Sequence, residues 1–201
     1  KPLWDGLLAG TSAVRRISSF DPAPFTSQIA SEVVDFDPAR FVDARQARRL
    51  DPFAQYAMAA AVEAVEDSGL DFSAEDPSRA GVIIGSGIGG FLEIETQHTR
   101  LLDKGPGRVS PFMIPKLMVN AAAGQISIRY GVRGPNAAAA TACASAANAI
   151  GDAFKIIQRG EADIMIAGGS EAALTPMGLA GFTSLRAISK RRGWRGPIKH
   201  L

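Results

Sequence analysis

The stretch PNAAAATACASAANAIGDAFKIIQRGEADIMIAGGSEA, residues 135–172, decides the fold class. Residues 135–142 are strand-like by position, although alanine favours helices. Residues 144–159 have the apolar periodicity of a helix, with spacings of three and four between Ala147, Ile150, Phe154 and Ile157. The segment ADIMIAGGSEA then reads as a short buried strand that ends in a glycine turn. A strand, a helix and a second strand in succession predict an α/β fold with parallel strands.

The segments upstream continue this alternation. RAGVIIGSGIGG, residues 79–90, predicts a buried strand followed by a glycine turn. Helices are predicted for FLEIETQHTRLLDKG and IPKLMVNAAAGQISIRYG, residues 91–105 and 114–131. A further helix should begin at Pro52, with Asp51 as its N-cap, and end at Gly69. The whole pattern indicates helices layered on a mostly parallel sheet.

The composition is that of a packed globular chain. Hydrophobic residues make up 46% and charged residues 21% of the 201 residues, which argues against disorder. Six cations and no acid lie in residues 186–201, and without them 16 basic residues face 20 acidic ones. The rest of the chain is therefore mildly acidic, so its charge gives no support to nucleic-acid binding. No apolar run of about 18 residues occurs, so no membrane span is expected.

Gly85, Gly87 and Gly90 match the G-x-G-x-x-G pattern of dinucleotide sites, between a predicted strand and a predicted helix. Such a site also needs an acidic residue about 20 positions on, at the end of a second strand. Asp103 has that distance but lies in a helical segment. The glycines are therefore interpreted as a tight turn that permits close packing, and room for a substrate chain near Ile88 stays open. No cofactor and no metal site is expected.

Cys143, the only cysteine, lies where the strand-like segment becomes a helix. There the helix N-terminus offers unpaired N–H groups and a partial positive charge, both of which stabilise a thiolate. The small neighbours Ala142, Ala144, Ser145 and Ala146 keep the approach open. A free cysteine is also commonly a small buried hydrophobe. The residues alone leave both roles open, and a single cysteine fits a reducing, cytoplasmic compartment.

A cysteine nucleophile usually has an imidazole partner, and this chain has two histidines. His98 belongs to an amphipathic helical segment and is expected to be a surface residue. His200 lies in the basic tail. Neither suggests a Cys–His dyad, so a self-contained cysteine hydrolase is not expected.

TACASAANAIGDAFKIIQRGEADIMIAGGSEAALTPMGLAGF, which begins at Thr141, resembles the active-site region of class II β-ketoacyl-[acyl-carrier-protein] synthases, the condensing enzymes of fatty acid elongation. The resemblance extends upstream through YGVRGPN, SPFMIP, GVIIGSGIGG and DPFAQYAMAAAVEAVEDSGL, and covers roughly residues 1–189. It implies the thiolase-like fold, layered α-β-α-β-α, of which this chain would be essentially the N-terminal half.

The resemblance also implies roles for individual residues. Cys143 would accept the acyl group, and its backbone N–H would form half of an oxyanion hole. A carbanion from decarboxylated malonyl-carrier protein would then attack the thioester, lengthening the chain by two carbons. The acyl pocket would comprise Ile88, Gly178 and Phe182, with Met113 reaching across from the partner subunit. Residues 135–142 would pair with their copy across the axis of a homodimer, where small side chains allow close approach.

Acyl carrier protein is the partner that the resemblance implies. Carrier proteins are acidic, and basic residues at matching positions would steer them: Arg45, Arg48 and Arg49, with Arg108 as a further candidate. Four alternatives remain: a type II polyketide ketosynthase, another acyltransferase of the thiolase superfamily, a non-catalytic chain-length-factor subunit and a nucleotide-binding oxidoreductase. Cys143 argues against the chain-length factor, since those subunits usually lack that cysteine.

The chain departs from the family pattern at both ends. The strand that precedes LWDGLLAG in the family is missing, and residues 190–201 form a basic tail unlike the family, which we interpret as a possible frameshift. The family's second half, which carries two histidines, a lysine and a glycine-rich phenylalanine loop, is not in this sequence. We therefore expect the 201-residue chain alone to have no condensing activity.

Overall fold

The computed structural model describes residues 2–189, and the chain divides into two units. One unit comprises residues 37–173 and the other comprises residues 1–36 and 174–201. Each unit is described by itself, and the tail predicted at 190–201, with His200, lies outside the described residues.

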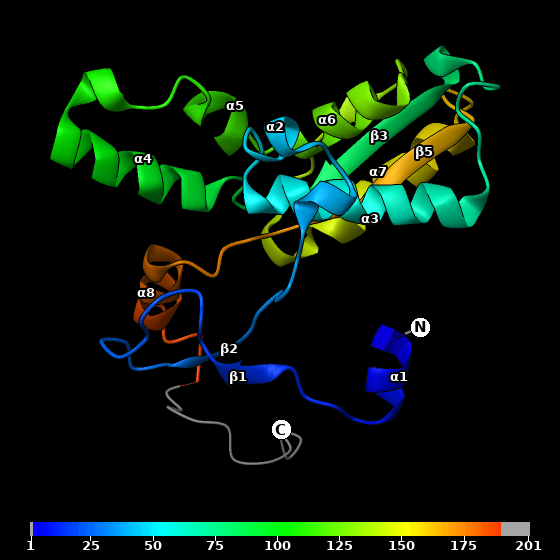
Figure 1. Ribbon diagram of the computed structural model, residues 1–201. Coiled ribbons are helices and arrows are strands. Elements are labelled where there is room, and N and C mark those ends of the chain that lie inside the picture. The colour runs from blue at the N-terminus through cyan, green and yellow to red at the C-terminus, as the bar shows by residue number, and fades with distance from the viewer. Residues whose placement is uncertain (1, 190–201) are drawn as a thin grey trace. The chain divides into compact units, whose positions relative to one another are not determined.

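The larger unit is built on a three-stranded parallel sheet (Figure 1). Its strand order is β4 (Asn136–Ala137), β3 (Ala80–Gly85), β5 (Ile164–Gly169). β3 pairs with β5 along its whole length, and with β4 at two positions. The alternation of strands and helices in the sequence therefore led to the correct fold class.

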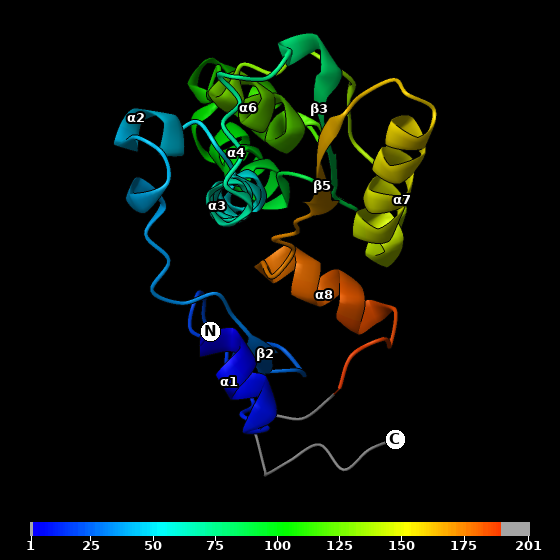
Figure 2. The ribbon, with the colours of Figure 1, turned by 90° about the vertical axis from the view of Figure 1, so that its right-hand side faces the viewer.

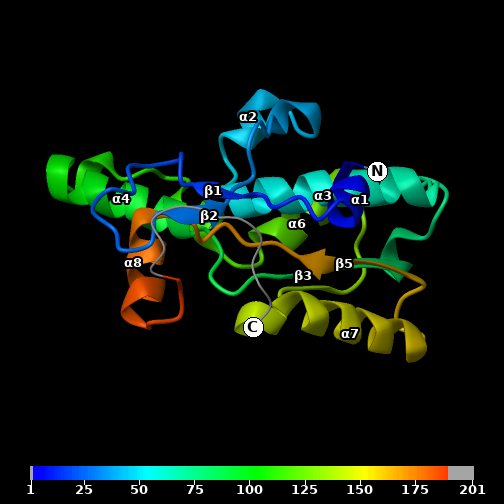
Figure 3. The ribbon, with the colours of Figure 1, turned by 90° about the horizontal axis from the view of Figure 1, so that it is seen from below.

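Helices cover both faces of this sheet. α3 (Pro52–Ser68) and α6 (Ala121–Tyr130) lie on one face, and α7 (Ser145–Gln158) lies on the other (Figures 2 and 3). β3 is buried along its whole length because it is covered on both sides. Val82 and Ile84 pack among the residues of α3 and α6, and Ile83 packs among those of α7. The larger unit thus forms three layers, α-β-α.

α3 begins and ends at the predicted residues. The Asp51 side chain caps the helix by accepting a hydrogen bond from the Phe53 N–H, and Pro52 occupies the first helical position. Gly69 ends the helix with a φ of 69°, a conformation that costs glycine little. These local signals lie within one or two residues of the boundaries that they determine.

The remaining elements of the larger unit are shorter or peripheral. They are α2 (Ala44–Ala47), α4 (Phe91–Lys104), α5 (Met113–Leu117) and four 3₁₀ turns, Pro38–Arg40, Pro77–Arg79, Pro106–Arg108 and Ala142–Ala144. The smaller unit contains α1 (Pro2–Leu8), an antiparallel pair of strands, β1 (Val14–Arg16) and β2 (Ile29–Ser31), and α8 (Pro176–Ser184).

The single helix predicted for residues 114–131 is wrong, because two helices, α5 and α6, occupy this segment. The Leu117 carbonyl accepts a hydrogen bond from Gly90 N–H at 3.1 Å. Met118 is then extended, with ψ at 132°, and the next helix begins at Ala121. A contact with a distant segment therefore accompanies the break, and the apolar periodicity of the segment could not reveal it.

The strand predicted for residues 135–142 is shorter than expected, since only Asn136–Ala137 is a strand. The chain nevertheless continues beside β3, because the Ser86 N–H donates to the Ala139 carbonyl at 3.0 Å. β4 lies at an edge of the sheet. Its outer side therefore has no neighbouring strand among the described residues.

The helix predicted for residues 144–159 is confirmed as α7, but its packing face differs from the apolar set that identified it. Ala149 and Ala153 are buried against the sheet, whereas Ile150 is 55% and Phe154 59% exposed. Small side chains face the sheet because the backbones approach closely: a Cβ on Gly169 would lie 2.6 Å from Ala146 Cβ. Periodicity identified the helix, and it did not identify which side would be covered.

A carboxylate supports the β1–β2 pair, and its effect should depend on pH. Glu32 accepts hydrogen bonds from the backbone N–H groups of Ser18 and Ser19, at 2.9 and 3.0 Å. Partial burial opposes the shift, but hydrogen bonds from the side chains and backbone N–H groups of Ser19 and Ser18 together lower the pKa of Glu32 from 4.5 to about 2. Because the pKa falls on folding, the stabilisation is complete above pH 4.5 and is lost as the pH falls towards 2.

We therefore expect the backbone amides of Ser18 and Ser19 to become less protected from hydrogen exchange between pH 4.5 and 2, after correction for the intrinsic rate. In Glu32→Gln, which cannot ionise, the loss of protection across this range should be much smaller. Equal losses in both proteins would contradict the assignment.

Candidate active site

Cys143 lies in a tight turn directly before α7. We call residues 141–145 the nucleophile turn. The thiol is exposed, so Cys143 is not the small buried hydrophobe that its residue type also allowed. Ala142, the preceding residue, has a φ of 52°, which is unusual for a residue with a Cβ. The junction predicted from the sequence is therefore present, and its backbone conformation is strained.

Hydrogen bonds inside the nucleophile turn hold it in shape. Ser145 Oγ accepts a bond from the Thr141 N–H at 2.9 Å and donates one to the Ala142 carbonyl at 2.7 Å. The Ala144 N–H donates to the Thr141 carbonyl at 3.1 Å. The Cys143 N–H has no hydrogen-bond acceptor within residues 2–189, so it remains available to a developing negative charge.

A second turn, the glycine turn of residues 85–90, lies beside the nucleophile turn. Its Gly87 and Ile88 N–H groups donate to one carboxylate oxygen of Glu171, at 2.8 and 3.1 Å. A Cβ on Gly87 would lie 3.3 Å from the Cα of Ala142. The sequence reasoning missed Glu171, although a signal existed: it follows β5 as the glycine turn follows β3, and these parallel neighbours end at the same edge of the sheet.

The glycine motif therefore serves close packing, as the sequence interpretation favoured. A Cβ on Gly85 would collide with the backbone of Ser145, and one on Gly90 would lie 2.5 Å from the Lys116 carbonyl oxygen. The turn N–H groups that would meet a pyrophosphate are bonded to an internal carboxylate. This arrangement does not favour a nucleotide site.

The four predicted acyl-pocket residues divide between the two units. Ile88, in the glycine turn, is 36% exposed, and Met113, the first residue of α5, is half-buried. Gly178 and Phe182 lie on α8, where Gly178 is buried and Phe182 is exposed. The Gly178 N–H donates to Thr175 Oγ1 at 3.0 Å, which caps this helix. The structure therefore describes each pair by itself.

Three of the predicted basic residues lie together on and after α2, and all three are exposed: Arg45, Arg48 and Arg49. The guanidinium of Arg49 stacks over the Phe112 ring at 4.8 Å, and Arg48 Nε donates to the Ala44 carbonyl at 3.2 Å. These contacts orient two of the three charges and leave the group accessible to an anionic partner.

Arg108, the fourth predicted basic residue, lies apart from this group. It follows α4, whose far end is well separated from α2 in Figures 1 and 3. There it lines a hollow of about 650 Å³ with Arg100 and Lys104, two cations that the sequence reasoning missed. Arg100 and Lys104 are four residues apart on one helix, so their spacing could have indicated a shared face.

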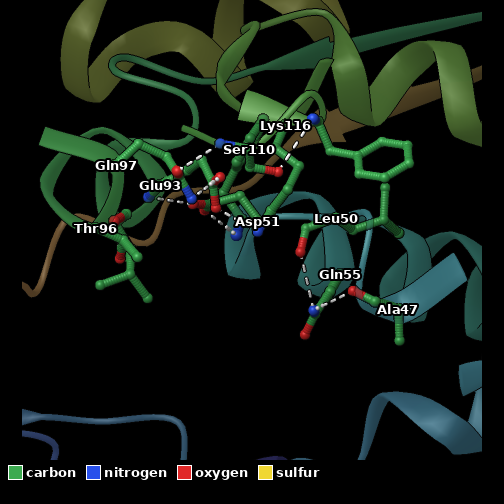
Figure 4. A network of polar contacts seen from close by, with 12 residues as sticks. Ala47, Leu50, Asp51, Gln55, Glu93, Thr96, Gln97, Ser110 and Lys116 are labelled. Atoms are coloured by element: carbon green, nitrogen blue, oxygen red, sulfur yellow. Dashed lines mark hydrogen bonds and ion pairs between the residues drawn. The ribbon is translucent and has the colours of Figure 1, made fainter. Parts of the chain in front are cut away.

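A buried polar network holds α5, and with it Met113, against α3 and α4 (Figure 4). Lys116 forms an ion pair with Glu93, whose side chain is 5% exposed. Glu93 Oε1 also accepts a bond from Gln97 at 2.9 Å, and the Glu93 N–H donates to Asp51 at 3.0 Å. Burial raises the pKa of Asp51, while hydrogen bonds from Phe53 and Glu93 and the charge of Lys116 oppose this shift. Lys116 is thus the cation that compensates two buried carboxyl groups.

Other chemistry-bearing residues lie outside this region. His98 is exposed on α4, as expected. Within the described part of the chain, residues 2–189, no group of three or more His, Cys, Asp or Glu side chains could hold a metal ion. No helix formed by these residues combines the length and apolar character that a membrane crossing requires.

Comparison with known proteins shows the family to which the chain belongs. The β-ketoacyl synthase N-terminal domain family matches residues 1–199. The chain belongs to this family. Its ketosynthase relatives include 3-oxoacyl-[acyl-carrier-protein] synthase 2 of Staphylococcus aureus, which is 48% identical over 189 residues, or 94% of this chain. The enzyme of the same name from Coxiella burnetii is also 48% identical over 189 residues.

Solved ketosynthase structures have the same fold. The ishigamide ketosynthase/chain length factor covers 92% of this chain with a TM-score of 0.84 and 28% identity. A type II polyketide synthase acyl-carrier protein in complex with its ketosynthase covers 76%, with a TM-score of 0.70 and 29% identity. The chain spans about half the length of the curated relatives it matches, 47% for the Staphylococcus aureus enzyme and 46% for the Coxiella burnetii enzyme. These likenesses establish that the chain has the N-terminal part of the thiolase-like fold.

Proposed function

We propose that this chain carries the acyl-accepting part of a 3-oxoacyl-[acyl-carrier-protein] synthase of fatty acid elongation. The observation that supports this most directly is the exposed Cys143 thiol, held in a strained turn at the start of α7. The thiolate attacks the carbonyl carbon of an acyl thioester, and the Cys143 N–H donates to the oxygen that becomes negative. The bond between the carbonyl carbon and the carrier sulfur then breaks, the leaving carrier thiolate takes up the equivalent of the proton that the Cys143 thiol lost, and the acyl group remains bound to Cys143.

The second step, decarboxylation of malonyl-carrier protein and attack on the thioester, needs groups that stabilise an enolate. In the family these are histidines and a lysine of the second half. The only histidine in the described residues, His98, is exposed on α4. The 201 residues alone should therefore accept an acyl group and form no carbon–carbon bond. The apolar stripe of Ile150, Phe154 and Ile157 on α7 would be covered by that second half.

The acyl chain would extend along Ile88, Gly178 and Phe182, with Met113 contributed by a second copy. We propose that residues 135–142 pair with the same residues of that copy in a homodimer. Support comes from β4, a strand at the edge of its sheet, with small side chains that permit close approach. A cytoplasmic location and a domain boundary at residue 189 remain predictions, and the family match runs ten residues further, to 199.

Acyl carrier protein is the proposed partner. Arg45, Arg48 and Arg49 form one exposed basic group, and Arg108 forms a second with Arg100 and Lys104. A structural neighbour of this chain is a ketosynthase in complex with its acyl-carrier protein, which supports such a partner. The two groups would attract an acidic partner at two separate points of its surface.

Incubation of the chain with acyl-carrier protein loaded with a saturated acyl group tests the proposal. We expect one adduct of the acyl mass, mapped to Cys143 by proteolysis and mass spectrometry. Absence of the adduct in folded protein, or an adduct on another residue, would contradict the proposal.

A type II polyketide ketosynthase is the second candidate. Two solved structures support it, because the ishigamide ketosynthase/chain length factor and the ketosynthase of a type II polyketide synthase both match most of the chain. Their identities of 28 and 29% are well below the 48% shared with 3-oxoacyl-[acyl-carrier-protein] synthase 2, which favours fatty acid elongation. Preference for a polyketide intermediate over saturated acyl groups in the same labelling assay would reverse this order.

Reversing two charges of the α2 group should weaken carrier-protein use selectively. In the double variant Arg45→Glu with Arg48→Glu, acylation of Cys143 by acyl-carrier protein should slow roughly tenfold at low salt, because steering depends on charge. Acylation by a small acyl thioester should be unchanged.

The matched control is Arg133→Glu. Arg133 is exposed and lies near Pro77, at the end of β3 opposite to the glycine turn. It should change neither rate appreciably. If both variants slowed the reaction alike, net charge rather than a docking site would be responsible.

A further inference from the structure

Ser145 is buried, although it follows an exposed cysteine by only two residues. The residue is 4% exposed. Both of its hydrogen bonds return to the nucleophile turn: Oγ accepts from Thr141 N–H at 2.9 Å and donates to the Ala142 carbonyl at 2.7 Å. One hydroxyl therefore joins the two backbone groups on the N-terminal side of Cys143.

The backbone of Ser145 is itself firmly placed. It packs so closely on β3 that a side chain at Gly85 would overlap its carbonyl group. α7 begins at this residue, and the Ser145 N–H also donates to the Ala142 carbonyl. The hydroxyl thus connects a fixed point of the fold to the N-terminal side of the nucleophile turn.

The strained residue lies between these two bonds. Ala142 has a φ of 52°, a conformation that a residue with a Cβ keeps only where its surroundings impose it. Without the hydroxyl, the Thr141 N–H would lose its acceptor, and the Ala142 carbonyl would lose one of its two donors. The turn could then relax, and the N–H and thiol of Cys143 would change direction together.

We propose that Ser145 is a positioning residue that holds Cys143 for acyl transfer. It acts through the backbone and does not touch the substrate. The identity of Cys143 as acyl acceptor rests on the proposed function, whereas the effect of Ser145 on the turn does not.

The test compares Ser145→Ala with the wild-type chain in two reactions of Cys143. Acyl transfer uses the orientation of the Cys143 N–H towards the developing oxyanion, while alkylation by iodoacetamide does not. We expect the acyl-transfer rate to fall about tenfold and the alkylation rate to change less than about threefold. Ser145→Thr, which keeps the hydroxyl, should recover most of the acyl-transfer rate.

Ser127→Ala is the matched control, because it removes a hydroxyl-to-carbonyl bond of 2.8 Å on α6. It should leave both rates unchanged. Hydrogen exchange at the Thr141 amide gives an independent readout, and its protection should disappear only in Ser145→Ala.

Three outcomes would overturn the inference: an acyl-transfer rate within twofold of wild type in folded Ser145→Ala, equal loss in both reactions, or unchanged protection of the Thr141 amide. Failure of the wild-type chain to become acylated would instead overturn the proposed function, and the Thr141 amide would still report whether Ser145 holds the turn.

Discussion

Lys116→Met should destabilise the protein by about 3–5 kcal/mol, because it leaves the buried Glu93 carboxyl group without its cation. Asp51, buried nearby, would lose the same compensating charge. The effect is large against the total stability of a domain, about 5–15 kcal/mol. Urea unfolding followed by circular dichroism measures it as a lower midpoint at an unchanged slope.

A double variant identifies the cause. Lys116→Met with Glu93→Gln removes both charges and keeps an acceptor for Gln97, so most of the lost stability should return. Lys155→Met is the control, since Lys155 is exposed and its ammonium contacts Gln158 and the Phe154 ring, both on the same helix. A double variant no more stable than Lys116→Met would refute the charge explanation.

Cys143→Ser should lower the rate of acyl acceptance by on the order of 10³-fold or more, as removal of a nucleophile does in related covalent catalysis. The hydroxyl of serine is a weak nucleophile unless a neighbouring base activates it. The adduct measured by mass spectrometry should fall to background, while the urea midpoint stays near that of the wild type because residue 143 is exposed.

His98→Ala is the matched control for this experiment. His98 is exposed on α4, and no role in acyl acceptance is expected for it. Its acylation rate should remain within about twofold of wild type, since surface substitutions rarely disturb a distant site. A large loss would indicate that His98 assists Cys143, contrary to the expectation from the sequence.

Local signals in the sequence predicted much of the fold. Asp51, Pro52 and Gly69 marked the ends of α3, since caps and helix stops depend on residues within one turn of each boundary. The junction at Cys143 followed from the change of pattern beside it. The single helix predicted for residues 114–131 was wrong, and a longer-range bond from Gly90 to Leu117 lies beside the break between α5 and α6. The periodicity of α7 did not indicate that its apolar stripe would be exposed.

The sequence by itself determined the fold class and the family and indicated Cys143 as the candidate nucleophile, because each depends on residue types at short spacing. Only the tertiary structure decided which groups surround that nucleophile. Glu171 meets the glycine turn across 83 and 84 positions of sequence, and Lys116 meets Glu93 across the α4–α5 connection. Parallel strands and packed helices bring these partners together: the strand ends indicated the edge of the sheet at which Glu171 lies, but not the groups that it binds there. The role proposed for the Ser145 hydroxyl likewise depends on the tertiary structure, which shows that Ser145 is buried, that Thr141 donates to its hydroxyl and that the Ala142 carbonyl accepts from it.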